Sequence, residues 1–251
     1  MIRVGRRIYN RDGTFTDPAF PGFTSILCLT KSSPYGDIGP YCLKDDQGRI
    51  MENIWQFSKV YEKVPKTREK YSRYNNRIIW DHPEETHFEN DKLAQEYWAW
   101  RKKGMENPDH VRYPVGYRDR GACLFAIQEE PELEDQEDVP QNKRLGYIDA
   151  RKQIYVPVFC DLVKTKEKFL ELRQRLDDGE NLLIIEVDGP HQESLEYYKE
   201  TYGVPDDFIE QNTVVIDEFN ISILLNDEKH PFGHGYCLAM ALLGTDVQWN
   251  Q

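Results

Sequence analysis

The clearest periodic pattern of apolar residues spans 147–176, where they recur at intervals of three and four and predict a long helix. Pro157 predicts an interruption of that helix near its first third. Four shorter segments also show helical spacing: 49–61, 92–103, 190–202 and 235–244. Apolar residues surround the first of these segments on nearly every side, which is typical of a buried helix.

Short apolar runs bounded by turn-forming residues predict strands at 24–30, 41–44 and 181–189. The segment 1–22 is rich in turn formers. The pattern at 213–225 does not distinguish a helix from a strand. Helices and strands do not alternate regularly, so a parallel βαβ architecture is not indicated. We therefore predict one α+β domain over residues 1–251, mainly helical with a small β-sheet.

The composition adds constraints on the partners of the chain. It has 251 residues, of which 39% are hydrophobic, enough to bury a core. The net charge of −12 argues against a protein that coats nucleic acid non-specifically. The segment 63–77 nevertheless combines six Lys and Arg residues with two Tyr residues, a combination suited to a phosphate backbone and a stacked base. The acidic segment 128–138 predicts a solvated loop.

The sequence also bears on the compartment. No apolar run approaches the roughly 18 residues that a membrane span needs. The N-terminal residues lack the apolar centre of a signal peptide. The five cysteines are scattered and form no C-x-x-C motif, so free thiols are expected. We expect a cytoplasmic protein with no membrane partner.

The most informative polar pattern lies on the helix predicted at 49–61. Glu52, Gln56 and Lys59 follow one another at i, i+4 and i+7, which places them on one face. Apolar residues occupy the flanking faces, and a buried acid or amine needs partners. The stripe therefore favours a functional site, with an exposed face or a structural ion pair as the alternative.

This stripe resembles the opening motif of a known family. E-x-x-x-Q-x-x-K, after a short strand and an S-x-P-Y loop that contains Ser33 and Tyr35, is similar to the start of the NADAR (YbiA-like) family. The second half is similar too, with Arg151 at a helix start, Lys168-Phe169, and an apolar strand that ends at Glu186. HPFGHG and YCLAMALL resemble its closing motifs. The resemblance covers 24–60 and 147–243, so 63–145 is expected to be an insertion.

The resemblance implies an N-glycosidase that needs no metal and no cofactor. Family members cleave N-glycosidic bonds in riboflavin-pathway intermediates or remove ADP-ribose from guanine in nucleic acid. We expect Glu52, Lys59 and Asp188 to be catalytic. The residues expected to bind substrate are Ser33, Tyr35, Gln56, Arg151, Glu186, Gly233 and His234. The basic insertion favours an ADP-ribosylated base in nucleic acid over a riboflavin precursor or another ribosyl nucleotide.

The chemistry is consistent with these residue types. Cleavage of a ribosyl C–N bond passes through an oxocarbenium-like state, which a carboxylate such as Glu52 stabilises while it aligns a water. Lys59 could position a phosphate or polarise the leaving group. Arg151 could clamp a pyrophosphate, or could be a surface residue near Asp149. The glycines around His234 would let a ligand approach the backbone.

Other interpretations stay open. Phe232, Tyr236 and Ala239 stand where the family has Trp, Asn and Gly, so the chain could bind ADP-ribose or a nucleotide without turnover. Glu186 and Asp188 share a strand face and could hold Mg²⁺ in a nuclease-like site. That nuclease interpretation is the least favoured, because no Lys follows in the expected order.

The segment 80–87, WDHPEETH, contains residue types that ligate divalent metals. They are Asp81, His82, Glu84, Glu85 and His87. Because acid-rich loops are usually solvated, we predict no metal site there.

Overall fold

The computed structural model describes residues 1–68, 70–71, 77–78 and 80–246. The chain forms two compact units. The first unit comprises Met1–Leu43 and Val156–Gln251, and the second unit comprises Lys44–Tyr155. The insertion predicted at 63–145 lies within the second unit, which also contains the Glu52 helix. Helices and small sheets occur together in the chain, which confirms the α+β class.

A four-stranded sheet forms the centre of the first unit, in the order β14 (Thr213–Val215), β1 (Ile2–Arg6), β13 (Leu182–Glu186), β4 (Thr24–Leu27). Both β1 and β4 run parallel to β13, whereas β14 is antiparallel to β1. All five residues of β13 are buried, as expected for an apolar strand covered on both faces. The carboxyl ends of the three parallel strands therefore lie at one edge of the sheet.

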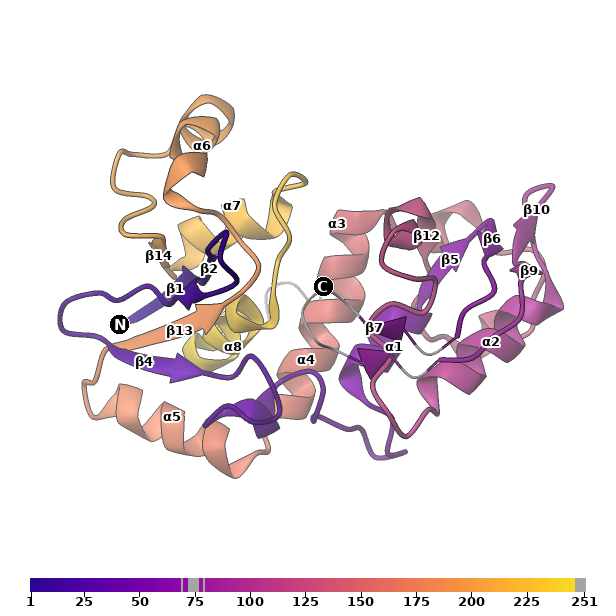
Figure 1. Ribbon diagram of the computed structural model, residues 1–251, viewed down its shortest axis with the longest axis horizontal. Coiled ribbons are helices and arrows are strands. Elements are labelled where there is room, and N and C mark those ends of the chain that lie inside the picture. Colours follow the sequence, from indigo (N-terminus) through magenta and orange to yellow (C-terminus); the bar gives the residue numbers. More distant parts are fainter. Residues whose placement is uncertain (69, 72–76, 79, 247–251) are drawn as a thin grey trace. The chain divides into compact units, whose positions relative to one another are not determined.

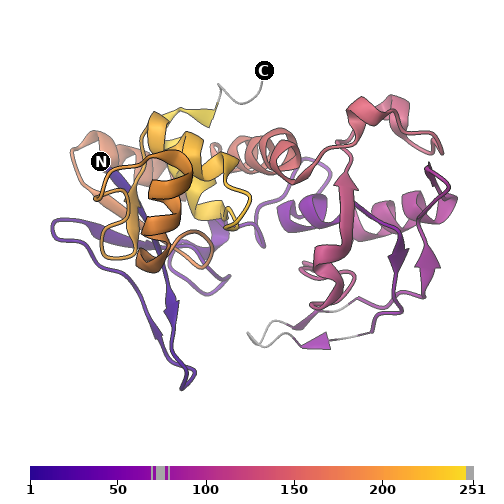
Figure 2. The same ribbon diagram turned by 90° about the horizontal axis from the view of Figure 1, so that it is seen from above.

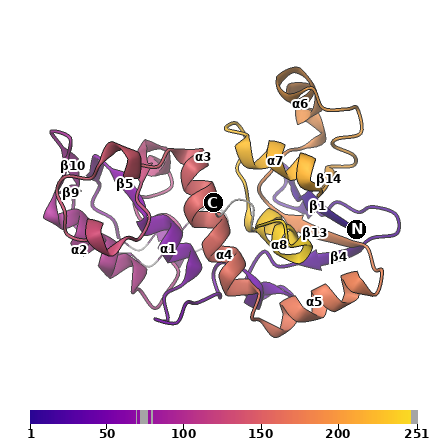
Figure 3. The same ribbon diagram turned by 180° about the vertical axis from the view of Figure 1, so that it is seen from behind.

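Helix α8 (His234–Leu243) covers one face of this sheet, in contact with β1 and β13 (Figures 1 and 3). Helices α4 (Val156–Val163) and α5 (Glu167–Asp177) pack against α8 in turn. Small side chains on α8 permit these close contacts, and Gly244 ends the helix in the left-handed conformation. These contacts fix the start of α8 beside the carboxyl end of β13.

The remaining elements of the first unit surround this centre. Figure 2 shows the hairpin of β2 and β3 projecting from the sheet. Their bounds, with those of the remaining helices, are β2 (Ile8–Tyr9), β3 (Phe15–Thr16), α6 (Leu195–Tyr202), α7 (Glu218–Asn226) and two 3₁₀ turns (Gly36–Ile38 and Gln192–Ser194). The carboxylate of Asp217 caps α7 by accepting a hydrogen bond of 2.7 Å from the backbone of Asn220.

The second unit combines short helices with two-stranded ladders. Its helices are α1 (Met51–Phe57), α2 (Gln95–Met105) and α3 (Tyr147–Ala150), the last continued by a π-helical segment (Arg151–Tyr155). Three 3₁₀ turns lie at Asp119–Ala122, Pro131–Leu133 and Gln141–Lys143. The ladders pair β5 (Lys59–Tyr61) with β12 (Cys123–Ala126), β6 (Lys63–Val64) with β9 (Glu85–Thr86), β7 (Lys70–Tyr71) with β8 (Arg77–Ile78), and β10 (Phe88–Glu89) with β11 (Lys92–Leu93).

An aromatic core joins these pieces. The Phe57 ring lies 4.8 Å from Trp80 and 4.5 Å from Trp100, measured between ring centroids. Gly104 on α2 permits this packing, since a Cβ atom at that position would overlap the Phe57 ring. Such aromatic contacts stabilise a core beyond the area they bury. The core therefore holds α1 against α2 in the second unit.

Several predicted elements differ from the observed ones. The strand predicted at 41–44 is wrong, since that segment contributes only an isolated bridge between Lys44 and Ile50. The helix predicted at 49–61 ends at Phe57, and the chain continues directly into β5. Strand β1 lies in the segment 1–22, which is rich in turn formers and for which no strand is predicted. The basic segment 63–77 falls partly on residues 69 and 72–76, which lie outside the described residues.

The interruption predicted at Pro157 is also wrong, because Pro157 lies inside α4. The preceding segment is π-helical, and its wider turn accommodates a residue that cannot donate a backbone hydrogen bond. The chain leaves the helix only after Val163.

None of the helices in the described ranges is long and apolar enough to cross a bilayer.

Candidate functional site

The predicted polar stripe on α1 forms a hydrogen-bonded chain. Gln56 Nε2 donates to Glu52 Oε1 at 2.9 Å, and Lys59 Nζ donates to Gln56 Oε1 at 3.0 Å. The Glu52 residue is only 5% exposed. The structure thus brings together the three residues of the motif, with Gln56 between the acid and the amine.

Asn53 fixes the orientation of α1. Its amide donates to the carbonyl oxygens of Asn107 (3.1 Å) and Asp109 (3.0 Å), and its own oxygen accepts from the backbone of Val111 at 2.7 Å. Asn53 is fully buried, so these bonds satisfy a polar group that would otherwise be costly to bury. Asn53 is absent from the residues predicted to be functional, although a polar residue on the apolar side of a buried helix is a usable signal.

Lys59 is partly buried at the start of β5. Its ammonium lies 4.6 Å from the centroid of the Trp55 ring. Burial lowers the pKa of Lys59, and nearby Cys123 and Glu52 oppose that effect. A lysine with a lowered pKa is a better proton donor than an exposed lysine.

Arg151 begins the π-helical segment and is 1% exposed. Its guanidinium lies 4.5 Å from the centroid of the Tyr147 ring. The Tyr155 ring at the other end of the segment contacts the Trp55 ring of α1 at 5.0 Å. Arg151 is therefore a buried residue on an element that packs against α1. Single π-helical turns are frequent at functional sites.

In the first unit, Glu186, Gly233 and His234 come together where β13 ends and α8 begins. The Glu186 carboxylate accepts hydrogen bonds from the backbone N–H groups of Val187 (2.7 Å) and Gly235 (2.6 Å). Its Oε2 also lies 3.2 Å from His234 Nδ1. A Cβ atom on Gly233 would collide with this carboxyl group. The motifs around Glu186 and His234 thus form one buried cluster.

His234 makes polar contacts with Glu186 and with both the carbonyl oxygen and the thiol of Cys28. Its Nδ1 faces Glu186, and its Nε2 lies 3.2 Å from the Cys28 carbonyl oxygen. Burial alone would lower the pKa of His234, but the Glu186 carboxylate and Cys28 raise it to about 10. The pair is therefore a buried imidazolium and carboxylate. Because protein groups already engage Glu186, the geometry does not favour a magnesium site with Asp188.

The other residues expected at the site have local partners. Ser33 Oγ donates to the Thr30 carbonyl oxygen at 2.8 Å. The Tyr35 hydroxyl donates to Glu171 at 2.9 Å and accepts from Arg175 at 2.6 Å. The structure thus uses these two side chains to hold the loop after β4 and to join it to α5. The Asp188 backbone N–H lies 3.4 Å from Glu186 Oε1.

The three departures from the family pattern are buried residues of the core. The rings of Phe232 and Tyr236 lie 5.1 Å apart, and Ala239 is fully buried in α8. The Tyr236 hydroxyl occupies the space that a Cβ atom on Gly189 would need. Gly189 has φ of +105°, a conformation that side-chain-bearing residues rarely adopt. Tyr236 thus packs the start of α8 against the loop after β13.

A buried aspartate network was not anticipated from the sequence as a site. The Asp227 carboxylate accepts hydrogen bonds from the hydroxyls of Tyr197 (2.9 Å) and Tyr198, and it lies 2.7 Å from His230 Nδ1. Burial alone would raise the pKa of Asp227, but these hydrogen bonds lower it. The network joins α6 to the segment that follows α7.

Searches of protein-family models, of curated proteins and of solved structures found no match to this chain. The resemblance to the NADAR family rests on the residues quoted above and stays a prediction.

Proposed function

We propose that the chain hydrolyses an N-glycosidic bond between ribose and a base. The preferred substrate is an ADP-ribosylated guanine in nucleic acid. A related ribosyl nucleotide is the alternative substrate. The observation that carries the proposal is the part-buried hydrogen-bonded chain Glu52–Gln56–Lys59, which holds a carboxylate on α1 close to an amine at the start of β5. We place the reaction in the cytoplasm.

Glu52 supplies the negative charge that this reaction needs. As the C–N bond breaks, positive charge develops on the anomeric carbon and the ring oxygen, and a nearby carboxylate stabilises it. The electron pair of the broken bond goes to the base nitrogen. Water adds to the anomeric carbon and gives up a proton to Glu52. A desolvated carboxylate is more effective than one in water, because protein dielectric screening is weaker.

Lys59 serves the leaving group. Its lowered pKa favours transfer of a proton to the departing base nitrogen. Gln56 holds the Glu52 and Lys59 side chains in register through its amide. Arg151 would pair with a pyrophosphate, because a guanidinium offers two parallel donors. The basic segment 63–77 would contact the nucleic-acid backbone.

The test uses a DNA oligonucleotide ADP-ribosylated on guanine, with released ADP-ribose measured by mass spectrometry. The wild-type chain should release ADP-ribose with and without EDTA. Glu52→Gln should lower the rate at least about 100-fold, since it removes the charge at the centre of the reaction. Glu62→Gln is the matched control, because Glu62 is exposed and lies directly after β5, outside the Glu52–Gln56–Lys59 hydrogen bonds.

Three results would contradict the proposal. Equal rates in the wild-type chain and in Glu52→Gln would remove Glu52 from the reaction. Binding of the oligonucleotide without release would favour a module that recognises ADP-ribose without turnover. Release of ADP-ribose, or cleavage of the oligonucleotide, that depends on added Mg²⁺ would favour metal-dependent chemistry.

A further inference from the structure

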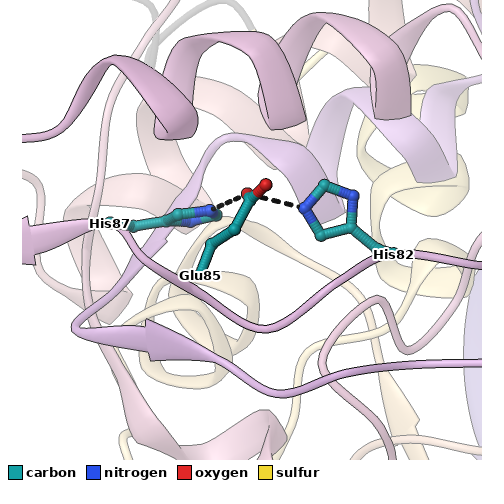
Figure 4. A group of neighbouring side chains, drawn as sticks. All are labelled: His82, Glu85 and His87. Atoms are coloured by element: carbon teal, nitrogen blue, oxygen red, sulfur yellow. Dashed lines mark hydrogen bonds and ion pairs between the residues drawn. The ribbon is translucent and has the colours of Figure 1, made fainter.

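The segment between β8 and β10 holds a cluster that the proposed reaction does not use. Of the five ligand-type residues at 81–87, the structure brings together His82, Glu85 and His87 (Figure 4). The two imidazoles approach the Glu85 carboxylate from different sides. One ligand atom from each residue lies within 4.8 Å of the other two.

We propose that His82, Glu85 and His87 bind one zinc ion or a similar divalent transition metal. Two histidines and a glutamate are a common zinc ligand set, and imidazole nitrogen favours the later metals of the first transition row. Three protein ligands leave a fourth position for water.

The distances between ligand atoms suit a tetrahedral zinc ion. Glu85 Oε2 lies 2.7 Å from His82 Nε2 and 3.2 Å from His87 Nε2. Around a zinc ion with bonds of about 2.0–2.1 Å, neighbouring ligand atoms are about 3.3 Å apart. Side-chain movements on the order of 1 Å therefore convert the hydrogen-bonded cluster into a coordination shell.

The surroundings hold the two imidazoles in place. His82 stacks on Trp80 with an interplanar angle of 12°, and the His87 ring contacts Trp100 at 5.1 Å. Among the described residues, neither ring has a hydrogen-bond partner at Nδ1, and each ring contacts the Glu85 carboxylate through its Nε2 atom. Burial lowers the pKa of His87, although Glu85 opposes that effect.

The backbone around the cluster is also fixed. His82 forms a two-way bridge with Thr67, and the His87 N–H donates to the Glu62 carbonyl oxygen at 2.9 Å. Glu85 itself lies in β9, which pairs with β6. A site on paired strands is held more firmly than one on a free loop.

The charge next to the cluster attracts cations. Glu85 lines an open hollow of about 520 Å³ that gives solvent a route to it. The other charged residues that line the hollow are Glu84, Glu89, Glu96, Glu137 and Lys92. This excess of acids raises the local concentration of divalent ions.

Direct binding measurements test the proposal. The full chain is dialysed against a chelator, then titrated with Zn²⁺ by calorimetry and with Co²⁺ by visible absorption. We expect one ion per chain and the absorption of tetrahedral Co²⁺. Zinc at about 100 times its Kd should raise the unfolding midpoint by about 5 °C or more. Tryptophan fluorescence reports this change, because four of the five tryptophans lie in the second unit.

One variant and a matched control test whether Glu85 is a ligand. Glu85→Gln should weaken binding more than about 100-fold, because even outer partners of a metal site contribute 10- to 100-fold. Glu84→Gln is the matched control, since it removes an exposed acid from the same segment and should leave the affinity within about threefold. Circular dichroism of both apo variants checks that they fold.

The outcomes separate clearly. A wild-type chain that binds no stoichiometric ion would overturn the proposal, as would unchanged affinity in Glu85→Gln. Equal weakening in both variants would assign the binding to diffuse acidic charge and would also overturn it. Since every readout is binding or stability, these results do not depend on whether the proposed glycosidase activity is found.

Discussion

Replacement of Glu186 by Gln is the sharpest test of the cluster at the edge of the first unit. The substitution keeps the size of the side chain but removes its charge. Glu186 is completely buried, and both carboxylate oxygens accept hydrogen bonds. We therefore expect a large loss of stability with almost no change in shape.

The magnitude follows from the geometry. A glutamine amide has one acceptor oxygen and one NH₂ group. If its oxygen faces the Val187 N–H, its NH₂ group faces the Gly235 N–H and His234; if the amide turns over, the Val187 N–H is left without an acceptor. Either orientation buries an unsatisfied donor and leaves His234 without its counter-charge. Breaking a buried pair from one side costs about 3–5 kcal/mol.

Urea unfolding followed by circular dichroism measures this loss. Hydrogen exchange of peptides from β13 and α8 assigns it to the first unit. Glu200→Gln is the control, because Glu200 is exposed on α6 and its replacement should change the free energy of unfolding by less than about 0.5 kcal/mol. If Glu186→Gln changed the free energy of unfolding by as little as the control does, the buried ion pair would be refuted.

The pH dependence gives a second check on the same pair. The folded pKa of His234, about 10, lies above the ordinary value of 6.5. The unfolded chain thus loses this proton first, and the stabilisation by protonated His234 is complete below about pH 6.5 and lost as the pH rises towards 10. The advantage of the wild-type chain over Glu186→Gln should therefore shrink between pH 7 and pH 10. A constant difference would show that the charge of His234 is not involved.

Three further predictions concern other sites. Gly104→Ala should destabilise the second unit by about 1–3 kcal/mol, because the added methyl group overlaps the Phe57 ring; an unchanged midpoint of thermal unfolding would contradict that packing. In the proposed reaction, deprotonation of Lys59 should lower the rate as the pH rises, and this decrease should occur at a pH below 10.5, the ordinary lysine pKa. Lys59→Arg should abolish this decrease in the pH–rate profile. Asp227→Asn should cost about 1–3 kcal/mol by calorimetry, because it weakens the acceptor of the Tyr198 hydroxyl; stability equal to wild type would argue against this network.

The sequence predicts an element well where one local pattern is strong. The run LLIIE is apolar at four successive positions, and it is β13 at the centre of the sheet. Strand β1 lacks such a signal, because Arg3 interrupts it. In the structure Arg3 is buried, its Nε donates to Thr213 Oγ1 at 3.0 Å, and its guanidinium lies 3.6 Å from the centroid of the Phe20 ring. Partners so distant in sequence cannot be read from local spacing.

The candidate site likewise combines local contacts with contacts between distant parts of the chain. Helical spacing alone places Glu52 and Gln56 on one face, and the observed hydrogen bond joins them. Lys59 contacts Gln56 although it belongs to β5 and not to the helix, so the spacing gives this contact only approximately. Nothing local indicates that Asn53 reaches the backbone at Asn107 and Asp109, because that contact depends on how the chain folds back.

The proposed metal cluster and the proposed catalytic helix share one core. Phe57 at the end of α1 contacts Trp80 and Trp100, which in turn contact His82 and His87. A chelator would thus act on α1 by loosening this core, without removing a group from the reaction. In the presence of a chelator, activity should be lost only as the second unit unfolds on heating. It should persist at temperatures well below the unfolding midpoint of the metal-free chain. Loss of activity at temperatures where the apo chain is fully folded would instead place the metal in the chemistry.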